Sequence, residues 1–120
     1  REGYFLTSNI PGSWISFDFG KYRVRPLRYA MKHGGKNNIM RHWELQGSND
    51  HISWITLKKH SNDTTIPRGN ACSVGVWDIR DPHQDFRYLR IIQTGQTSDE
   101  THYLTMGGFE VYGYVNSVDL

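Results

Sequence analysis

Apolar and polar residues alternate with period two in short stretches along the chain, and polar turns separate these stretches. Such alternation predicts half-buried β-strands, because successive side chains of a strand point to opposite faces. The clearest case lies in residues 42–57, where two alternating runs flank a polar segment. Asn49 and Asp50 suit a turn there, because their short side chains bond nearby backbone groups. This stretch therefore predicts a β-hairpin whose apolar positions are Trp43, Leu45, Gly47, Ile55 and Leu57.

The same period predicts further strands over residues 14–19, 24–32, 72–77, 86–93 and 103–115. Pro26 cannot donate a ladder hydrogen bond, which favours a sheet edge or a strand start at that position. No stretch carries the apolar stripe of a helix of three turns. Seven or eight short strands with polar turns predict an all-β jelly-roll sandwich of about eight antiparallel strands. We expect its inward positions to be Ile15, Phe17, Phe19, Leu27, Tyr29, Met31, Cys72, Val74, Val76, Leu89, Ile91, Phe109, Val111 and Gly113.

The connections between these strands are polar. Residues 33–40 and 94–100 predict loops, residues 59–70 a long surface connection, and residues 80–85 a turn.

The length of 120 residues fits one domain. The single cysteine, Cys72, cannot form an internal disulfide, which favours a reducing, cytoplasmic location. No apolar run approaches the roughly 18 residues of a membrane span. The net charge of +2 is too small to indicate nucleic-acid binding, so we regard DNA and RNA as unlikely partners.

Four motifs in order along the chain indicate a family. They are SWISFDFG at residues 13–20, WELQGSNDHISW at 43–54, FRYLRI at 86–91 and GGFEVYG at 107–113. Together they resemble discoidin domains, also called coagulation factor V/VIII C-type domains, which have a galactose-binding-like fold. The flanking cysteines of that family are missing, and Tyr4 and Tyr114 stand roughly where the N- and C-terminal ends are expected to meet. His51 stands where the family often has glycine, so we expect a hairpin loop of different shape.

Four longer segments point to one branch of this family: YFLTSN at residues 4–9, LRYAMKHGG at 27–35, MRHWELQGSND at 40–50 and THYLTMGGFEVYG at 101–113. They resemble the intracellular discoidin-like domains that accompany BTB proteins and HECT-type ubiquitin ligases. The resemblance implies that residues 1–120 are a single domain excised from a larger ubiquitin-pathway or scaffold protein. It also implies a noncatalytic recognition module whose ligand binds on loops at one pole of the sandwich.

The candidate loops are residues 7–12, 33–41 and 94–102. The second is rich in hydrogen-bond donors, and Arg41 could hold a carboxylate through two parallel bonds. We therefore predict a polar site for a protein or peptide segment that carries an acidic or amide group. The alternative for Arg41 is an internal ion pair with Glu44 or Glu110. The candidate ligand-binding residues are Asn9, Lys32, His33, Lys36, Asn37, Asn38, Arg41, Thr97 and His102.

Other functions find less support in the residues. No nucleophile stands in a recognisable arrangement with a base, so we expect no catalytic residues and no enzyme activity. The six histidines have no zinc-ligand spacing, and we expect no metal and no cofactor. Trp14 and Trp77 fall out of phase with their strands and could be partly exposed, which keeps a carbohydrate-binding module as the alternative function. A third possibility is that the domain only packs against its neighbours. We expect the isolated domain to be monomeric.

Overall fold

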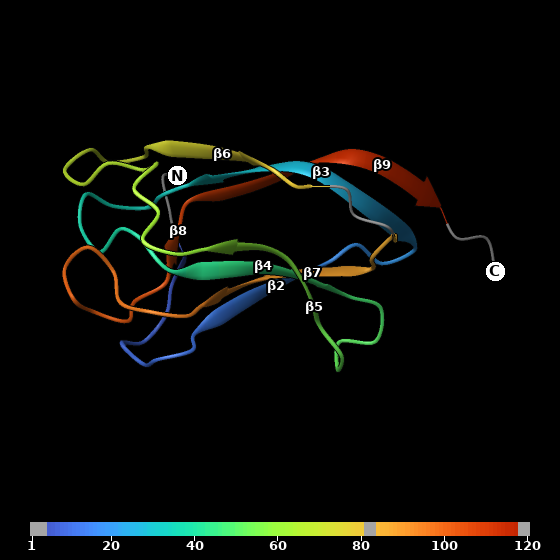
Figure 1. Ribbon diagram of the computed structural model, residues 1–120, viewed down its shortest axis with the longest axis horizontal. Coiled ribbons are helices and arrows are strands. Elements are labelled where there is room, and N and C mark those ends of the chain that lie inside the picture. The colour runs from blue at the N-terminus through green and yellow to red at the C-terminus, as the bar shows by residue number, and fades with distance from the viewer. Residues whose placement is uncertain (1–4, 81–83, 118–120) are drawn as a thin grey trace.

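The computed structural model describes residues 5–80 and 84–117, and these form strands joined by loops and turns (Figure 1). All strand pairs are antiparallel. The strands are β1 (Phe5–Leu6), β2 (Trp14–Asp18), β3 (Tyr22–Lys32), β4 (Trp43–Ser48), β5 (Ile55–His60), β6 (Val74–Asp78), β7 (Tyr88–Gln93), β8 (Thr105–Met106) and β9 (Gly108–Ser117). The predicted all-β sandwich is confirmed.

Two sheets form the layers of the sandwich (Figure 1). One has the strand order β2-β7-β4-β5 and the other the order β6-β3-β9, while β1 pairs with β8 as a short third ladder. Side chains from the facing sides of both layers make the core. Its fully buried members include Tyr29, Trp43, Leu45, Phe86, Leu89 and Ile91.

The predicted hairpin is β4–β5, and its loop spans residues 49–54. Ser48 Oγ accepts the N–H groups of Asp50 and His51, at 3.2 and 2.9 Å, and so fixes the turn. His51 has a φ of 61°, which is the left-handed conformation that a glycine adopts readily. His51 therefore adopts the backbone conformation that a glycine would favour at this position. A histidine in place of the family's glycine does not by itself require a loop of different shape.

The phase of the strand in residues 72–77 was predicted wrongly. Val74 and Val76 are 55% and 51% exposed, whereas Trp77 is buried, and Cys72 lies exposed at a φ of 62°. Burying one indole removes more apolar area from water than burying a valine, so the tryptophan decides which face turns inward. Gly75 then has to be small, because a Cβ at this position would lie 2.3 Å from the Trp77 ring.

Leu27 is a second correction, because it is 39% exposed rather than inward. The register of β3 against β9 shifts between Pro26 and Arg28, which indicates a β-bulge. The extra residue at the bulge reverses which alternate positions of β3 point into the core. Pro26 is buried before the bulge, and Tyr29 is buried after it. Pro26 lies in the central strand of its sheet, but β6 pairs only with Arg28–Lys32, so Pro26 has a ladder neighbour on the β9 side alone.

Two expectations fall on residues outside the described ranges. They are the middle of the turn at 80–85, namely residues 81–83, and the position of Tyr4.

Candidate functional site

The three candidate loops lie together at one end of the sandwich, on the left in Figure 1. Hydrogen bonds join them: Ser98 N–H donates to Ile39 O at 2.9 Å, and His102 N–H donates to Asn9 Oδ1 at 2.6 Å. A fourth segment joins the same end, because Gly69 N–H donates to Lys36 O at 2.8 Å. We call this end the loop pole and define it by residues 7–12, 33–41, 61–73 and 94–102.

A cavity of about 310 Å³ opens at the loop pole. Three of the nine candidate residues line it, namely Lys36, Asn37 and Asn38, and each comes from the loop after β3. The other lining residues are Leu6, Gly35, Tyr103 and Thr105. The wall thus combines an ammonium group and amides with an aromatic ring and an aliphatic side chain.

Lys36 and Asn37 are exposed, and among the described residues their side chains have neither a hydrogen bond nor an ion pair. Asn38 is partly engaged, because its Oδ1 accepts a hydrogen bond of 2.7 Å from Thr101 Oγ1. Its φ of 58° lies in the left-handed region that asparagine tolerates better than most residues. The exposed donors of Lys36 and Asn37 are therefore available to a ligand.

His33 lies beneath the cavity rather than on its wall, and it is buried. Its Nε2 donates to Asn37 O at 3.0 Å, so Nδ1 is the acceptor for Thr105 Oγ1, also at 3.0 Å. Burial lowers the pKa of His33, and the hydrogen bond to Asn37 opposes this only in part. The neutral imidazole closes the loop and holds Asn37 in place, instead of contacting the cavity.

Arg41 also turns away from the cavity. Its Nη1 donates to the backbone oxygens of Ile66 and Asp63, at 2.7 and 3.3 Å. Neither Glu44 nor Glu110, the two carboxylates considered from the sequence, is its partner. The guanidinium instead fastens the segment 61–73 to the loop pole.

The four remaining candidates also have internal roles or lie elsewhere. Thr97 is buried, and its Oγ1 hydrogen-bonds with Thr101 Oγ1 at 2.6 Å. Asn9 Oδ1 and the backbone N–H of His102 join their two loops, and neither residue lines the cavity. Lys32 is half-buried at the end of β3 and lines a different hollow, next to Val74 and Glu110.

Sequence reasoning missed Leu6, Tyr103 and Thr105 as wall residues. Leu6 reaches the cavity because β1 pairs with β8, which places it opposite Thr105. A two-residue strand has no period to detect, so the sequence carries no signal for this pairing.

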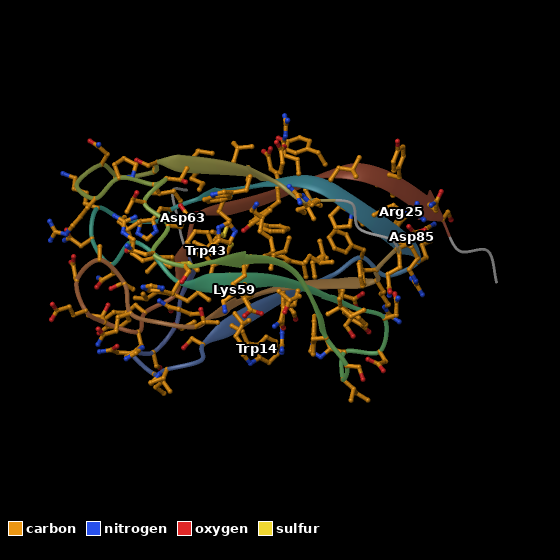
Figure 2. The ribbon with its side chains drawn as sticks, in the orientation of Figure 1. Trp14, Arg25, Trp43, Lys59, Asp63 and Asp85 are labelled. Atoms are coloured by element: carbon orange, nitrogen blue, oxygen red, sulfur yellow. The ribbon has the colours of Figure 1, made fainter. Side chains whose placement is uncertain are left out.

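A second polar cluster was also missed, and it lies in the core around His60. Trp43 Nε1 donates to Tyr29 Oη at 2.9 Å, and the Tyr29 hydroxyl donates to His60 Nε2. His60 Nδ1 donates to Asp63 Oδ2 at 2.7 Å, and Trp77 Nε1 donates to the same oxygen at 3.1 Å. Figure 2 shows Trp43 and Asp63 between the two layers, towards the loop pole.

The His60 cluster joins an acid, an imidazole and a hydroxyl, as some catalytic sites do, but Tyr29 is completely buried and no substrate can reach it. Burial lowers the pKa of His60 and raises that of Tyr29. Burial would also raise the pKa of Asp63, but the hydrogen bonds from Thr65 and His60 outweigh it and keep that carboxylate ionised. The cluster is a structural network.

Within residues 5–80 and 84–117, no three His, Cys, Asp or Glu side chains are grouped so that they could hold a metal ion. The same residues contain no helix with the length and hydrophobicity that a membrane crossing requires.

Residues 3–106 match the F5/8 type C domain. The chain belongs to this family. Its relatives include the E3 ubiquitin-protein ligase Ufd4 of Drosophila melanogaster, 37% identical over 93% of the chain, and the E3 ubiquitin-protein ligase hecd-1 of Caenorhabditis elegans, 34% identical over 93%. A BTB/POZ domain-containing protein of Arabidopsis thaliana is 30% identical over 85% of the chain. The chain spans 4% of the length of each ligase and 13% of the BTB/POZ protein.

Solved structures share the fold of this F5/8 type C domain. One is CpGH89CBM32-5 from Clostridium perfringens in complex with GalNAc-β-1,3-galactose, with a TM-score of 0.69 and 11% identity. It aligns with 93% of this chain and 76% of its own. The SusE-like protein BT2857 has a TM-score of 0.72 and 16% identity, over 94% of this chain and 52% of its own. At these identities the likeness shows the galactose-binding-like sandwich and nothing of the ligand.

Proposed function

We propose that this F5/8 type C domain is a noncatalytic recognition module that binds a protein or peptide segment at the loop pole. The observation that carries the proposal is the cavity there, where the exposed donors of Lys36 and Asn37 stand beside the ring of Tyr103. A segment with an acidic or amide side chain next to an apolar one would satisfy both parts of this wall. Loops held by a rigid sandwich suit such recognition, because they are ordered before the ligand arrives.

The relatives support a proposal about the cellular setting. Both ligases attach ubiquitin to proteins according to their names, and a recognition domain in such a protein would select a substrate or position a partner. We therefore place this domain within a longer cytoplasmic protein of the ubiquitin pathway, or within a scaffold.

A carbohydrate is the second candidate ligand. A solved structure of the same fold is in complex with a disaccharide, and Tyr103 offers an aromatic ring at the cavity. Two tryptophans considered for sugar stacking do not strengthen this candidate, because Trp77 is buried and Trp14 does not line the cavity.

The test is a chemical-shift titration of the ¹⁵N-labelled chain with a pooled peptide library and a pooled sugar library. We expect peptides to shift the amide signals of residues 35–38 and 103–105. Lys36→Ala should abolish these shifts, whereas Lys59→Ala on β5, which replaces an exposed lysine outside the cavity, should keep them. High salt should weaken binding of a peptide carboxylate but not of a neutral sugar. Shifts with sugars alone would replace the proposal with the carbohydrate candidate, and silence from both pools would refute it.

A further inference from the structure

The outer face of the four-stranded sheet carries an arginine that is held between two tryptophans. Arg90 on β7 has Ser16 of β2 and Gln46 of β4 as its register neighbours. Its guanidinium lies 4.1 Å from the ring centre of Trp54 and 5.4 Å from that of Trp14. Trp14 projects from the side of this sheet that faces away from the three-stranded sheet (Figure 2).

Arg90 differs in its partners from the arginines that form ion pairs. Its Nε donates to the neutral amide oxygen of Gln46 at 2.7 Å, and its two Nη atoms have no hydrogen bond to any described residue. Four other arginines, by contrast, each form an ion pair with an aspartate: Arg25 with Asp85, Arg28 with Asp78, Arg68 with Asp99 and Arg87 with Asp18.

The surroundings of Arg90 favour an anion. Burial lowers its pKa, which means that the cation has lost hydration without gaining a direct carboxylate partner. Glu44 is near, but its Oε1 accepts hydrogen bonds from Gln46 Nε2 at 2.9 Å and from Thr56 Oγ1 at 2.7 Å. Glu44 therefore attracts Arg90 through space but forms no hydrogen bond with it. The two Nη atoms remain free to bind a planar carboxylate side by side.

One exposed apolar side chain, Trp14, contacts this arginine, and another lies in the β4–β5 loop, two residues before Trp54. Trp14 is 43% exposed, and Ile52, at the tip of the β4–β5 loop, is 82% exposed. The loop is fixed, because Asp50 Oδ1 accepts the N–H groups of Ile52 and Ser53, both at 2.9 Å. The ring of His51 lies 5.8 Å from that of Trp14 and links the loop to the sheet. Tryptophan and arginine anchors next to apolar area are typical of the centres of protein interfaces.

We propose that this face is a second binding site, distinct from the loop pole, at which Arg90 takes the carboxylate of an acidic side chain in a partner protein. Apolar residues beside that acid cover Trp14 and Ile52. The partner chemistry follows from the charge: a rigidly held cation with free donors, flanked by flat apolar surfaces, is complementary to a carboxylate with apolar neighbours.

The test uses two defined probes, the tripeptide acetyl-leucyl-glutamyl-leucyl amide and its glutaminyl counterpart. Each is titrated into the ¹⁵N-labelled chain, up to roughly 20 mM because a short peptide binds with a Kd on the order of 1 mM. The indole N–H signals of Trp14 and Trp54 should shift with the glutamyl probe only. The indoles of Trp43 and Trp77 donate hydrogen bonds inside the core, so their signals should stay and report an intact fold.

Arg90→Lys keeps the charge but loses the planar fork, and we expect about tenfold weaker binding of the glutamyl probe. Arg87→Lys is the matched control, because Arg87 also lies over a ring, that of Tyr88, but already pairs with Asp18. The Arg87→Lys variant should bind the glutamyl probe as tightly as the unmodified chain does. If Arg90→Lys disturbs the core indole signals, Trp14→Ala on the edge strand β2 takes its place and should also weaken binding.

Three results would overturn the proposal: no saturable shift, equal shifts with both probes, or unchanged affinity in the Arg90 or Trp14 variant. Shifts confined to residues 35–38 would assign the acidic probe to the loop pole instead. Lys36→Ala separates the two sites, because it should leave the shifts of Trp14 and Trp54 in place.

Discussion

The His60 cluster and the loop-pole cavity both bring polar side chains together, but the two regions use their polar groups differently. In the His60 cluster, each N–H or hydroxyl donor finds an internal acceptor, from Trp43 through Tyr29 and His60 to Asp63. At the cavity, Lys36 and Asn37 have donors that meet no described residue. Polar groups that satisfy one another hold the fold, whereas those left over can serve a ligand.

The two buried histidines, His33 and His60, both belong to the scaffold. His33 supports the cavity from below and His60 belongs to the core, and burial lowers the pKa of both. Both imidazoles have a donor and an acceptor role fixed by their partners, so both are neutral parts of the scaffold. The following predictions test this division, from the largest expected effect to the smallest.

Asp63→Ala should have the largest effect on stability. It removes the acceptor for His60 Nδ1 and Trp77 Nε1, so two donors inside the protein lose their partner. We expect the free energy of unfolding to fall by about 3 kcal/mol. Urea denaturation measures this, and Asp78→Ala, which breaks the exposed pair with Arg28, should change it by less than about 1 kcal/mol. Equal losses in both variants would contradict the prediction.

Tyr29→Phe should come next. The ring stays, but Trp43 Nε1 loses its acceptor and His60 Nε2 its donor. The expected loss is about 2 kcal/mol, measured in the same way. Tyr112→Phe is the control: it removes an exposed hydroxyl that bonds to Glu110, and the stability should be almost unchanged.

Arg41→Ala tests whether this arginine belongs to the scaffold. Losing the two bonds to Asp63 O and Ile66 O should lower the free energy of unfolding by roughly 1–2 kcal/mol. Peptide shifts at residues 35–38 should persist at temperatures where the variant is folded. If Arg41→Ala kept normal stability but lost peptide binding, Arg41 would instead be a ligand-binding residue.

Acidification should destabilise the protein through both histidines. Each has a folded-state pKa below the usual 6.5, so below pH 6.5 the unfolded chain binds more protons than the folded one. Their contribution is full above pH 6.5 and declines as the pH falls towards the folded-state values. Unfolding curves at pH 7.5 and 5.0 measure the difference, and this range lies above the usual titration of carboxylates. A stability that rises on acidification would show that the histidines gain protons on folding.

Lys36→Ala should have the smallest effect on stability, about 0.5 kcal/mol or less, because its exposed ammonium has no partner among the described residues. The same change should remove peptide binding at the cavity. This combination is the opposite of the one expected for Arg41→Ala, so the two variants together decide whether the division between scaffold and ligand groups is correct.

Part of this structure could be predicted from local patterns. The β4–β5 hairpin follows from alternation around a turn, and the inward positions Leu89 and Ile91 follow from the same period. The hairpin and these inward positions depend on which side chains prefer water, and that preference is a property of each residue in its strand. The three candidate loops also lie together at one pole, as the family resemblance implied.

The phase of β6 and the bulge in β3 could not be predicted, because each depends on a partner distant in the chain. Val74 and Val76 face outward since the Trp77 ring fills the core between the sheets, and Leu27 turns out at a bulge set by the pairing with β9. A single strand does not specify which of two apolar faces the rest of the protein can accommodate.

The sequence by itself determined an all-β sandwich of the F5/8 type C family and the loops that meet at its pole. Only the tertiary structure decided which polar residues remain free. His33 and Arg41 look as suitable for a ligand as Lys36, and they differ only in the hydrogen bonds that distant segments offer them. Since a hydrogen bond made inside the protein uses up the donor, the fold assigns each polar side chain to the scaffold or to the ligand.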